Sequence, residues 1–154
     1  MESNEKQKLY ALRKAQLKRA MVSKFYFEAV FIEYAMLEDR TESLLRHAGG
    51  IKLTDRKGDP LGLHAKINKI KSCAPFAEKK VRKRLPYDLL DEVIEWKDKR
   101  NSMVHALMKN RADGNELKAV AEQGRELVRL VENAARTVNR YFDERASQNT
   151  AAAE

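Results

Sequence analysis

The residues of this chain with the clearest capacity for chemistry lie together in the run Arg100-Asn101-Ser102-Met103-Val104-His105. A histidine has an ordinary pKa of ~6.5, so it can accept and donate a proton near neutral pH. Arginine stays charged, and its planar guanidinium binds two phosphate oxygens at once. The amide of Asn101 could orient either a phosphate or the imidazole. These residue types fit cleavage of RNA by its own 2′-OH, which needs proton transfer and a cation beside the phosphate, but no metal.

The place of the arginine on its helix gives this run more weight than its spacing does. In a helix from about residue 87 to 109, successive residues rotate by ~100°, and apolar residues cover close to half of the wheel. Arg100 falls in the middle of that apolar arc, and the other two polar residues of interest lie at its edge. Because arginine is rarely buried without a partner, Arg100 either marks a functional site or pairs with a buried carboxylate, such as Glu33 or Glu38.

The run resembles the motif of the HEPN superfamily, whose ribonuclease members are small all-α proteins with an Arg, four to six residues, then a His. The resemblance implies a metal-independent endoribonuclease of toxin or phage-defence type, with RNA as substrate and without a cofactor. In it, His105 is the acid and base, Arg100 stabilises the phosphate, and Asn101 belongs to the same catalytic site. The resemblance also implies a homodimer with a composite cleft, and a protein antitoxin as a further partner. Ala106 and Leu107 stand where family members often have Gly and Tyr, so regulation by tyrosine modification is not implied.

A second pair, Arg40 and His47, also fits the loose spacing, with six residues between. We treat that match as accidental, since only Arg100 is followed by an asparagine late in an amphipathic helix. Arg100 and His105 are ~140° apart on an ideal helix, so they converge only by long reach, a helix irregularity or contact across a dimer axis. The wide apolar arc is consistent with an isologous interface. We therefore expect Arg100, Asn101 and His105 to line a cleft at a dimer interface.

Basic residues are distributed unevenly along the chain. Its 154 residues include 31 Lys and Arg against 23 Asp and Glu, a formal net charge of +8. The predicted RNA contacts are Lys79, Lys80, Arg82, Lys83 and Arg84. The same cluster includes Lys66, Lys69 and Lys71, and a second one runs from Lys6 to Lys24. Such clusters can neutralise phosphates, but no aromatic residue interleaves the first one, so a merely solvated face is the alternative. Two non-catalytic functions therefore stay open, a helical interaction or dimerisation protein and a basic module that binds RNA or DNA.

The remaining composition limits the compartment and the kind of site. Cys73 is the single cysteine, so no internal disulfide can form. Three histidines and one cysteine, widely spaced, match no metal-ligand pattern. The first residues lack the apolar region of a signal peptide, and no apolar run approaches the ~20 residues of a membrane span. We expect a cytoplasmic protein that binds no metal and no membrane.

Helices must position all of these residues, because six Gly and three Pro leave most of the chain without helix breakers. Residues 5–47 predict one long helix, or two in series with a bend near Ser23, ended by Gly49-Gly50. The other predicted helices cover residues 61–74, a short stretch up to 85, 87–109 and 116–146, with a loop at 54–60 and a turn at 110–115. We expect an all-α antiparallel bundle of four or five helices, one domain over residues 1–146, and a frayed tail at 147–154.

Overall fold

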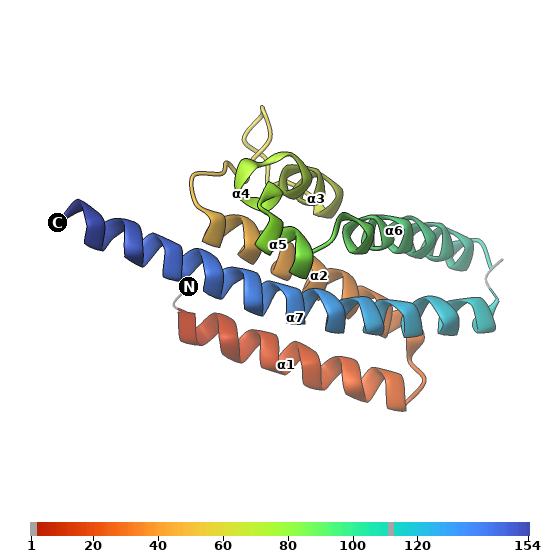
Figure 1. The fold of residues 1–154 in the computed structure, drawn as a ribbon. Helices are drawn as coiled ribbons and strands as arrows, with labels where there is room; N and C mark the ends of the chain where they lie inside the picture. Colours follow the sequence, from red (N-terminus) through yellow and green to blue (C-terminus); the bar gives the residue numbers. More distant parts are fainter. Residues whose placement is uncertain (1–2, 111–112) are drawn as a thin grey trace. The chain divides into compact units, whose positions relative to one another are not determined.

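The computed structural model describes residues 3–110 and 113–154, and over these residues the protein is all-α, as predicted (Figure 1). The described helices are α1 (Ser3–Val22), α2 (Tyr26–Ala48), α3 (Leu63–Ser72), α4 (Ala74–Ala77), α5 (Lys79–Arg84), α6 (Tyr87–Met108) and α7 (Gly114–Ala153). The described residues form no strand, and only an isolated bridge joins Thr54 and Pro60 in the predicted loop. The predicted turn at 110–115 includes residues 111 and 112, which lie outside the described residues.

The helices outnumber the four or five predicted, partly because the N-terminal stretch forms two. α1 ends in a Schellman motif, in which the N–H of Phe25 donates to the Ala20 carbonyl at 2.8 Å and that of Lys24 to Met21 at 3.2 Å. Lys24 takes the left-handed conformation that closes this motif, with a φ of 60°. The bend predicted near Ser23 is therefore a complete break between two helices.

The stretch between α3 and α6 also divides, into the two short helices α4 and α5 (Figure 1). Glu78 interrupts them, because its backbone is extended, with φ −62° and ψ 137°. Pro86, expected in the first turn of α6, lies just before it, and its carbonyl accepts the N–H groups of Leu89 and Leu90. At the start of α7, the Asp113 carboxylate accepts the N–H of Asn115 at 2.9 Å, so Asp113 caps this helix.

The chain divides into two compact units, and α2, α6 and α7 each contribute a segment to both. Unit 1 comprises Met1–Met36 and Glu95–Val128, and unit 2 comprises Leu37–Ile94 and Arg129–Glu154. The largest buried side chains of unit 1 are Met36, Trp96 and Leu127. In unit 2, Phe76 and Phe142 pack edge to face at 5.3 Å between ring centroids. The single domain expected over residues 1–146 stays a prediction beside this division.

Residues 147–153, expected to fray, continue α7 as exposed helix. The hydroxyl of Ser147 donates to the Asp143 carbonyl, and that of Thr150 to the Ala146 carbonyl, each at 3.0 Å. Alanine, the best helix former, makes up three of the last four residues of the chain. Fraying of this end in solution stays a prediction.

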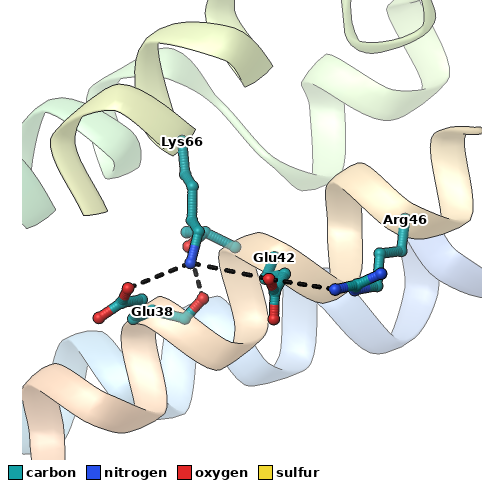
Figure 2. A network of polar contacts seen from close by, with 5 residues as sticks. Glu38, Glu42, Arg46 and Lys66 are labelled. Carbon is teal, nitrogen blue, oxygen red and sulfur yellow. Dashed lines mark hydrogen bonds and ion pairs between the residues drawn. The ribbon is translucent and has the colours of Figure 1, made fainter. Parts of the chain in front are cut away.

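One residue of the expected basic face is instead buried in unit 2. Lys66 reaches from α3 to α2, where its Nζ lies 3.1 Å from Oε1 of Glu38 and 4.0 Å from Oε1 of Glu42 (Figure 2). Glu42 in turn pairs with Arg46 at 3.3 Å. Lys66 is only 4% exposed, so its assignment to the exposed cluster is wrong. A charged group is buried only with compensating partners, and the two glutamates provide them.

No described helix has a segment both long enough and apolar enough to span a bilayer. Among the same residues, no group of three or more His, Cys, Asp or Glu side chains is arranged to hold a metal ion.

Candidate functional site

Arg100 lies on the part of α6 that belongs to unit 1, and two aromatic rings of α2 support its guanidinium. The guanidinium carbon lies 4.5 Å from the ring centroid of Phe31 and 4.7 Å from that of Tyr34. These rings are three residues apart on α2, so they share one face of that helix. A cation over an aromatic face is attracted by the negative charge of the ring face. The apolar arc of α6 thus accommodates an arginine because its neighbour is aromatic.

The alternative of a buried arginine–carboxylate pair is wrong for the described residues. Arg100 forms no ion pair with any of their carboxylates, the oxygens of Glu33 have no hydrogen-bond partner, and Glu38 binds Lys66. The guanidinium donates to Oδ1 of Asn101 at 3.0 Å through Nη1, while its Nε is buried without a partner. Burial lowers the pKa of Arg100 from its ordinary value, and charge interaction with Tyr34 opposes that shift. The positive charge of Arg100 is therefore not neutralised within the described chain.

His105 is exposed on α6 and is not brought to Arg100 by a break in the helix. α6 is regular from Tyr87 to Met108, so the two residues stay ~140° apart around its axis. The side chain of His105 forms no hydrogen bond or ion pair with any residue that the structure describes. Asn101 is exposed as well and contacts Arg100. One chain thus brings together two of the three predicted catalytic residues.

The neighbouring cavity of unit 1 does not join these three residues either. It has a volume of about 640 Å³ and lies along α6 and α7. Its lining consists of Asp98, Lys99, Ser102, Met103, Ala106, Glu116, Ala119 and Val120. These α6 residues alternate with Arg100, Asn101 and His105 but do not include them. The expected cleft would therefore need a second copy of the chain, and it stays a prediction.

The second Arg–His pair has carboxylate neighbours in unit 2. Arg40 donates from Nε to the Asp39 carboxylate at 3.0 Å. Nδ1 of His47 lies 2.7 Å from Oδ1 of Asp143 on α7. Both side chains thus have carboxylate neighbours, and the interpretation that their spacing is accidental stays a prediction.

The five predicted RNA contacts divide into two sets. All five are exposed on α5, in unit 2. Three of them, Lys79, Arg82 and Lys83, line a cavity of about 460 Å³ together with Ala77, Pro86, Tyr87 and Asp88. The other two, Lys80 and Arg84, do not line it.

The sequence did not reveal the aromatic residues beside Arg100 or those beside the basic residues of α5. The helical periodicity of residues 5–47 marks Phe31 and Tyr34 only as apolar positions, yet Phe31 and its edge-to-face neighbour Phe27 are 44% and 43% exposed. The signal was the spacing of Phe27, Phe31 and Tyr34, which puts three aromatic rings on one face of α2. Tyr87 was missed because it follows Pro86 and starts the next helix, although its ring lies under the guanidinium of Arg82 at 4.3 Å.

A further feature of unit 1 that sequence reasoning missed is a carboxyl group in its core. Glu33 is fully buried, and neither carboxyl oxygen has a hydrogen-bond partner. Burial raises the pKa of Glu33 to about 9, an effect that the charge of Arg125 partly offsets. Gly124 leaves room for this group, since a Cβ there would lie 2.7 Å from Cδ of Glu33 and from Cζ2 of Trp96. Glu33 is thus neutral at pH 7 and adds no charge to the surroundings of Arg100.

In unit 1, Arg100 lies over an aromatic ring, forms no ion pair with a described carboxylate and donates a hydrogen bond to Asn101. His105 lies further along the same helix. Comparison of the chain with protein-family models, with curated proteins and with solved structures finds no match.

Proposed function

We propose that the protein is a metal-independent endoribonuclease, with RNA as its substrate. The observation that carries the proposal is the state of Arg100. Its guanidinium is held over Phe31 and Tyr34 and forms no ion pair with any described carboxylate. A fixed, partly desolvated cation of this kind stabilises an anion more strongly than a mobile surface charge does. The phosphate of RNA is the anion that the nearby histidine could act upon.

In the proposed reaction, the 2′-OH of a ribose attacks the adjacent phosphorus while His105 accepts its proton. The bond between phosphorus and the 5′ oxygen breaks, and that oxygen takes a proton from a second imidazole. The products are a 2′,3′-cyclic phosphate and a 5′-hydroxyl. Arg100 stabilises the additional negative charge of the pentacovalent phosphate, and Asn101 orients the guanidinium through its 3.0 Å hydrogen bond.

The second imidazole is that of His105 of the partner subunit in a homodimer. Two arguments support this arrangement. One histidine cannot easily be the base and the acid of the same turnover, and one chain leaves His105 on a different side of α6 from Arg100. A two-fold interface over this part of α6 would place two copies of each residue in one cleft. The role in toxin or phage-defence systems, an antitoxin partner and the cytoplasmic location are proposed on the family resemblance alone.

The proposal is tested by cleavage of a single-stranded RNA in EDTA. We expect wild type to cut the RNA and to leave the 2′-deoxy version intact, because the 2′-OH is the nucleophile. His105→Ala is expected to lower the rate by 10²-fold or more, the usual contribution of a general acid or base. His64→Ala, which removes an exposed histidine from α3, serves as the control and should leave the rate unchanged. Equal rates in wild type and His105→Ala, or no cleavage by either, would reject the proposal.

A second candidate function is binding of RNA without cleavage, and the α5 cavity favours it. Three cations and an aromatic ring line that cavity. If RNA binds without being cut, and binding weakens steeply with salt, this second function replaces the first. If RNA neither binds nor is cut, that result favours the remaining function, a non-catalytic helical protein for interaction or dimerisation.

A further inference from the structure

We propose that the cavity between α5 and the start of α6 binds one nucleotide of a single-stranded RNA. The phosphate lies on Lys79 and Lys83, and the base stacks on Arg82 and Tyr87. The inference rests on the RNA-binding part of the proposed function and not on cleavage. At about 460 Å³, the cavity is within the 300–1,000 Å³ usual for small-ligand sites.

The three cations of the cavity are free to bind an anion. None of Lys79, Arg82 and Lys83 forms an ion pair in the part of the chain that the structure describes, whereas two cations of α3 do. Lys71 pairs with Asp91 at 2.5 Å, and Lys66 pairs with Glu38. Asp88 is the single acidic residue of the cavity lining.

The acidic residue nearest to the cluster in sequence is occupied by α7. Tyr141 donates its hydroxyl to the Glu78 carboxylate at 2.6 Å, and Arg145 forms an ion pair with the same group. Glu78 is therefore compensated from another helix instead of by the lysines that follow it. Lys79 and Lys83 are four residues apart on α5, so their side chains are neighbours and can approach one phosphate.

A planar stack beside these lysines favours a nucleotide over other anions. The guanidinium of Arg82 lies over the Tyr87 ring at 4.3 Å, and the Tyr87 hydroxyl donates to the Lys71 carbonyl at 3.1 Å, which fixes the ring. Guanidinium planes and aromatic rings are the surfaces on which unpaired bases stack. A lipid headgroup or polyphosphate would use the charges but not the plane, so single-stranded RNA fits the whole lining best.

The first experiment separates the cavity from the general basic character of α5. Binding of a fluorescein-labelled 12-nucleotide single-stranded RNA is followed by anisotropy over a range of salt, with His105→Ala as the parent protein so that the probe is not cut. Lys79→Gln and Lys83→Gln are each expected to reduce the slope of log Kd against log salt, by up to ~0.7, the value for the one phosphate that the two lysines share. Lys80→Gln and Arg84→Gln remove the same charge from the same helix outside the cavity, and they should reduce it by less than half as much. Equal effects of all four variants, or no binding by the parent, would overturn the proposal.

The second experiment separates a base from a bare anion. Arg82→Lys keeps the charge and loses the plane, so it should weaken RNA binding about 5-fold and leave binding of inorganic polyphosphate unchanged. Equal weakening of both ligands, or tighter binding to phosphatidylserine vesicles with the same ranking of variants, would contradict a nucleotide site. Melting curves by circular dichroism confirm that these surface variants fold. If the parent binds RNA with the expected ranking while wild type cuts nothing, the ribonuclease proposal fails and the nucleotide site stands.

Discussion

Glu33 places an acidic group among apolar side chains, where it is shielded from solvent and has no hydrogen-bond partner among the described residues. Ionisation there costs free energy, which is why burial raises its pKa to about 9. In the unfolded chain the same carboxyl has its ordinary pKa near 4.5. The folded form therefore holds a proton that the unfolded form has lost throughout the neutral range. The contribution of this proton to the free energy of unfolding is fully present below about pH 4.5 and is lost as the pH rises towards about 9.

Glu33→Gln should remove this pH dependence, because a glutamine has the same shape and never ionises. We expect the free energy of unfolding of wild type to fall relative to that of Glu33→Gln, by at most about 1.4 kcal/mol per pH unit between pH 5.5 and 8. Urea titrations at pH 5.5, 7 and 8 measure the difference. Glu28→Gln changes an exposed glutamate of the same helix and should run parallel to wild type. If the free energy of unfolding of Glu33→Gln also changes with pH in parallel with that of wild type, Glu33 is not held protonated by the fold.

At the same scale, the sequence indicated the position of the candidate site but not its surroundings. Helical periodicity alone placed Arg100 in an apolar arc and thus marked it as unusual, and the structure confirms that the residue is half-buried. Periodicity does not say which helix faces that arc, so it could not distinguish a carboxylate of α2 from Phe31 and Tyr34. The proposed relation of Arg100 to His105 across two chains could not be predicted from any spacing within one chain.

Among the elements, α7 packs tightly in unit 1 at Gly124, against the side chains of Glu33 from α2 and Trp96 from α6. A Cβ at this position would lie 2.7 Å from Cζ2 of Trp96, a distance that Cβ atoms essentially never show. Trp96 cannot easily move, because it is fully buried and its Nε1 donates to the Val120 carbonyl at 2.9 Å. The glycine is therefore needed for packing, although a glycine within a helix costs conformational entropy.

Gly124→Ala should destabilise the protein by about 1–3 kcal/mol, the usual cost of an added methyl group in a filled core. Gly114→Ala is the matched control on the same helix, since no atom of the described residues lies within 4 Å of a Cβ at that position. We expect the control to melt at or above the wild-type temperature, because alanine is the better helix former. In a Glu33→Ala background the cost of Gly124→Ala should shrink, as one of the two obstructing groups is gone. An unchanged cost in that background would mean that Trp96 alone sets the limit.

The elements themselves were largely predictable, since long stretches without Gly or Pro and with helical periodicity favour helix. The breaks were less so. The left-handed turn between α1 and α2 is made by Lys24, where glycine is the usual residue, so composition gave no sign of a complete break. Gly49, by contrast, has a φ of 77° directly after α2, and there the predicted end is confirmed. The short helices α4 and α5 are separated by the extended backbone of Glu78, which no sequence pattern predicts.

At the scale of the whole molecule, charge and assembly decide how the candidate sites could act together. A net charge of +8 attracts RNA to all faces at low salt. Under the proposed function, specific action depends on cations that form no ion pair with the described residues and that also lie over an aromatic ring or in a cavity. Arg100 in unit 1 is one, and the three cavity residues of unit 2 are others. The proposed cleavage would additionally require a second copy of the chain.

Mixing wild type with His105→Ala tests whether two copies form one cleft. If each turnover uses a histidine from both subunits, mixed dimers are inactive. In a mixture of one wild-type chain to three His105→Ala chains, random exchange of subunits should then lower the activity per wild-type chain to about a quarter. If one chain acts alone, the activity per wild-type chain stays constant. Addition of the same amount of inactive protein immediately before the assay, without time for exchange, is the control.

α1 has few buried residues compared with the other long helices. Leu17 and Ala20, both in its second half, are its only buried side chains among residues 3–22, and the left-handed Lys24 follows directly. The first three turns of α1 thus contribute no fully buried side chain to the core of unit 1. Local opening of such a segment has a low free energy. Its amide hydrogens should therefore exchange with deuterium well before those of α2 and α6, on a timescale independent of global unfolding.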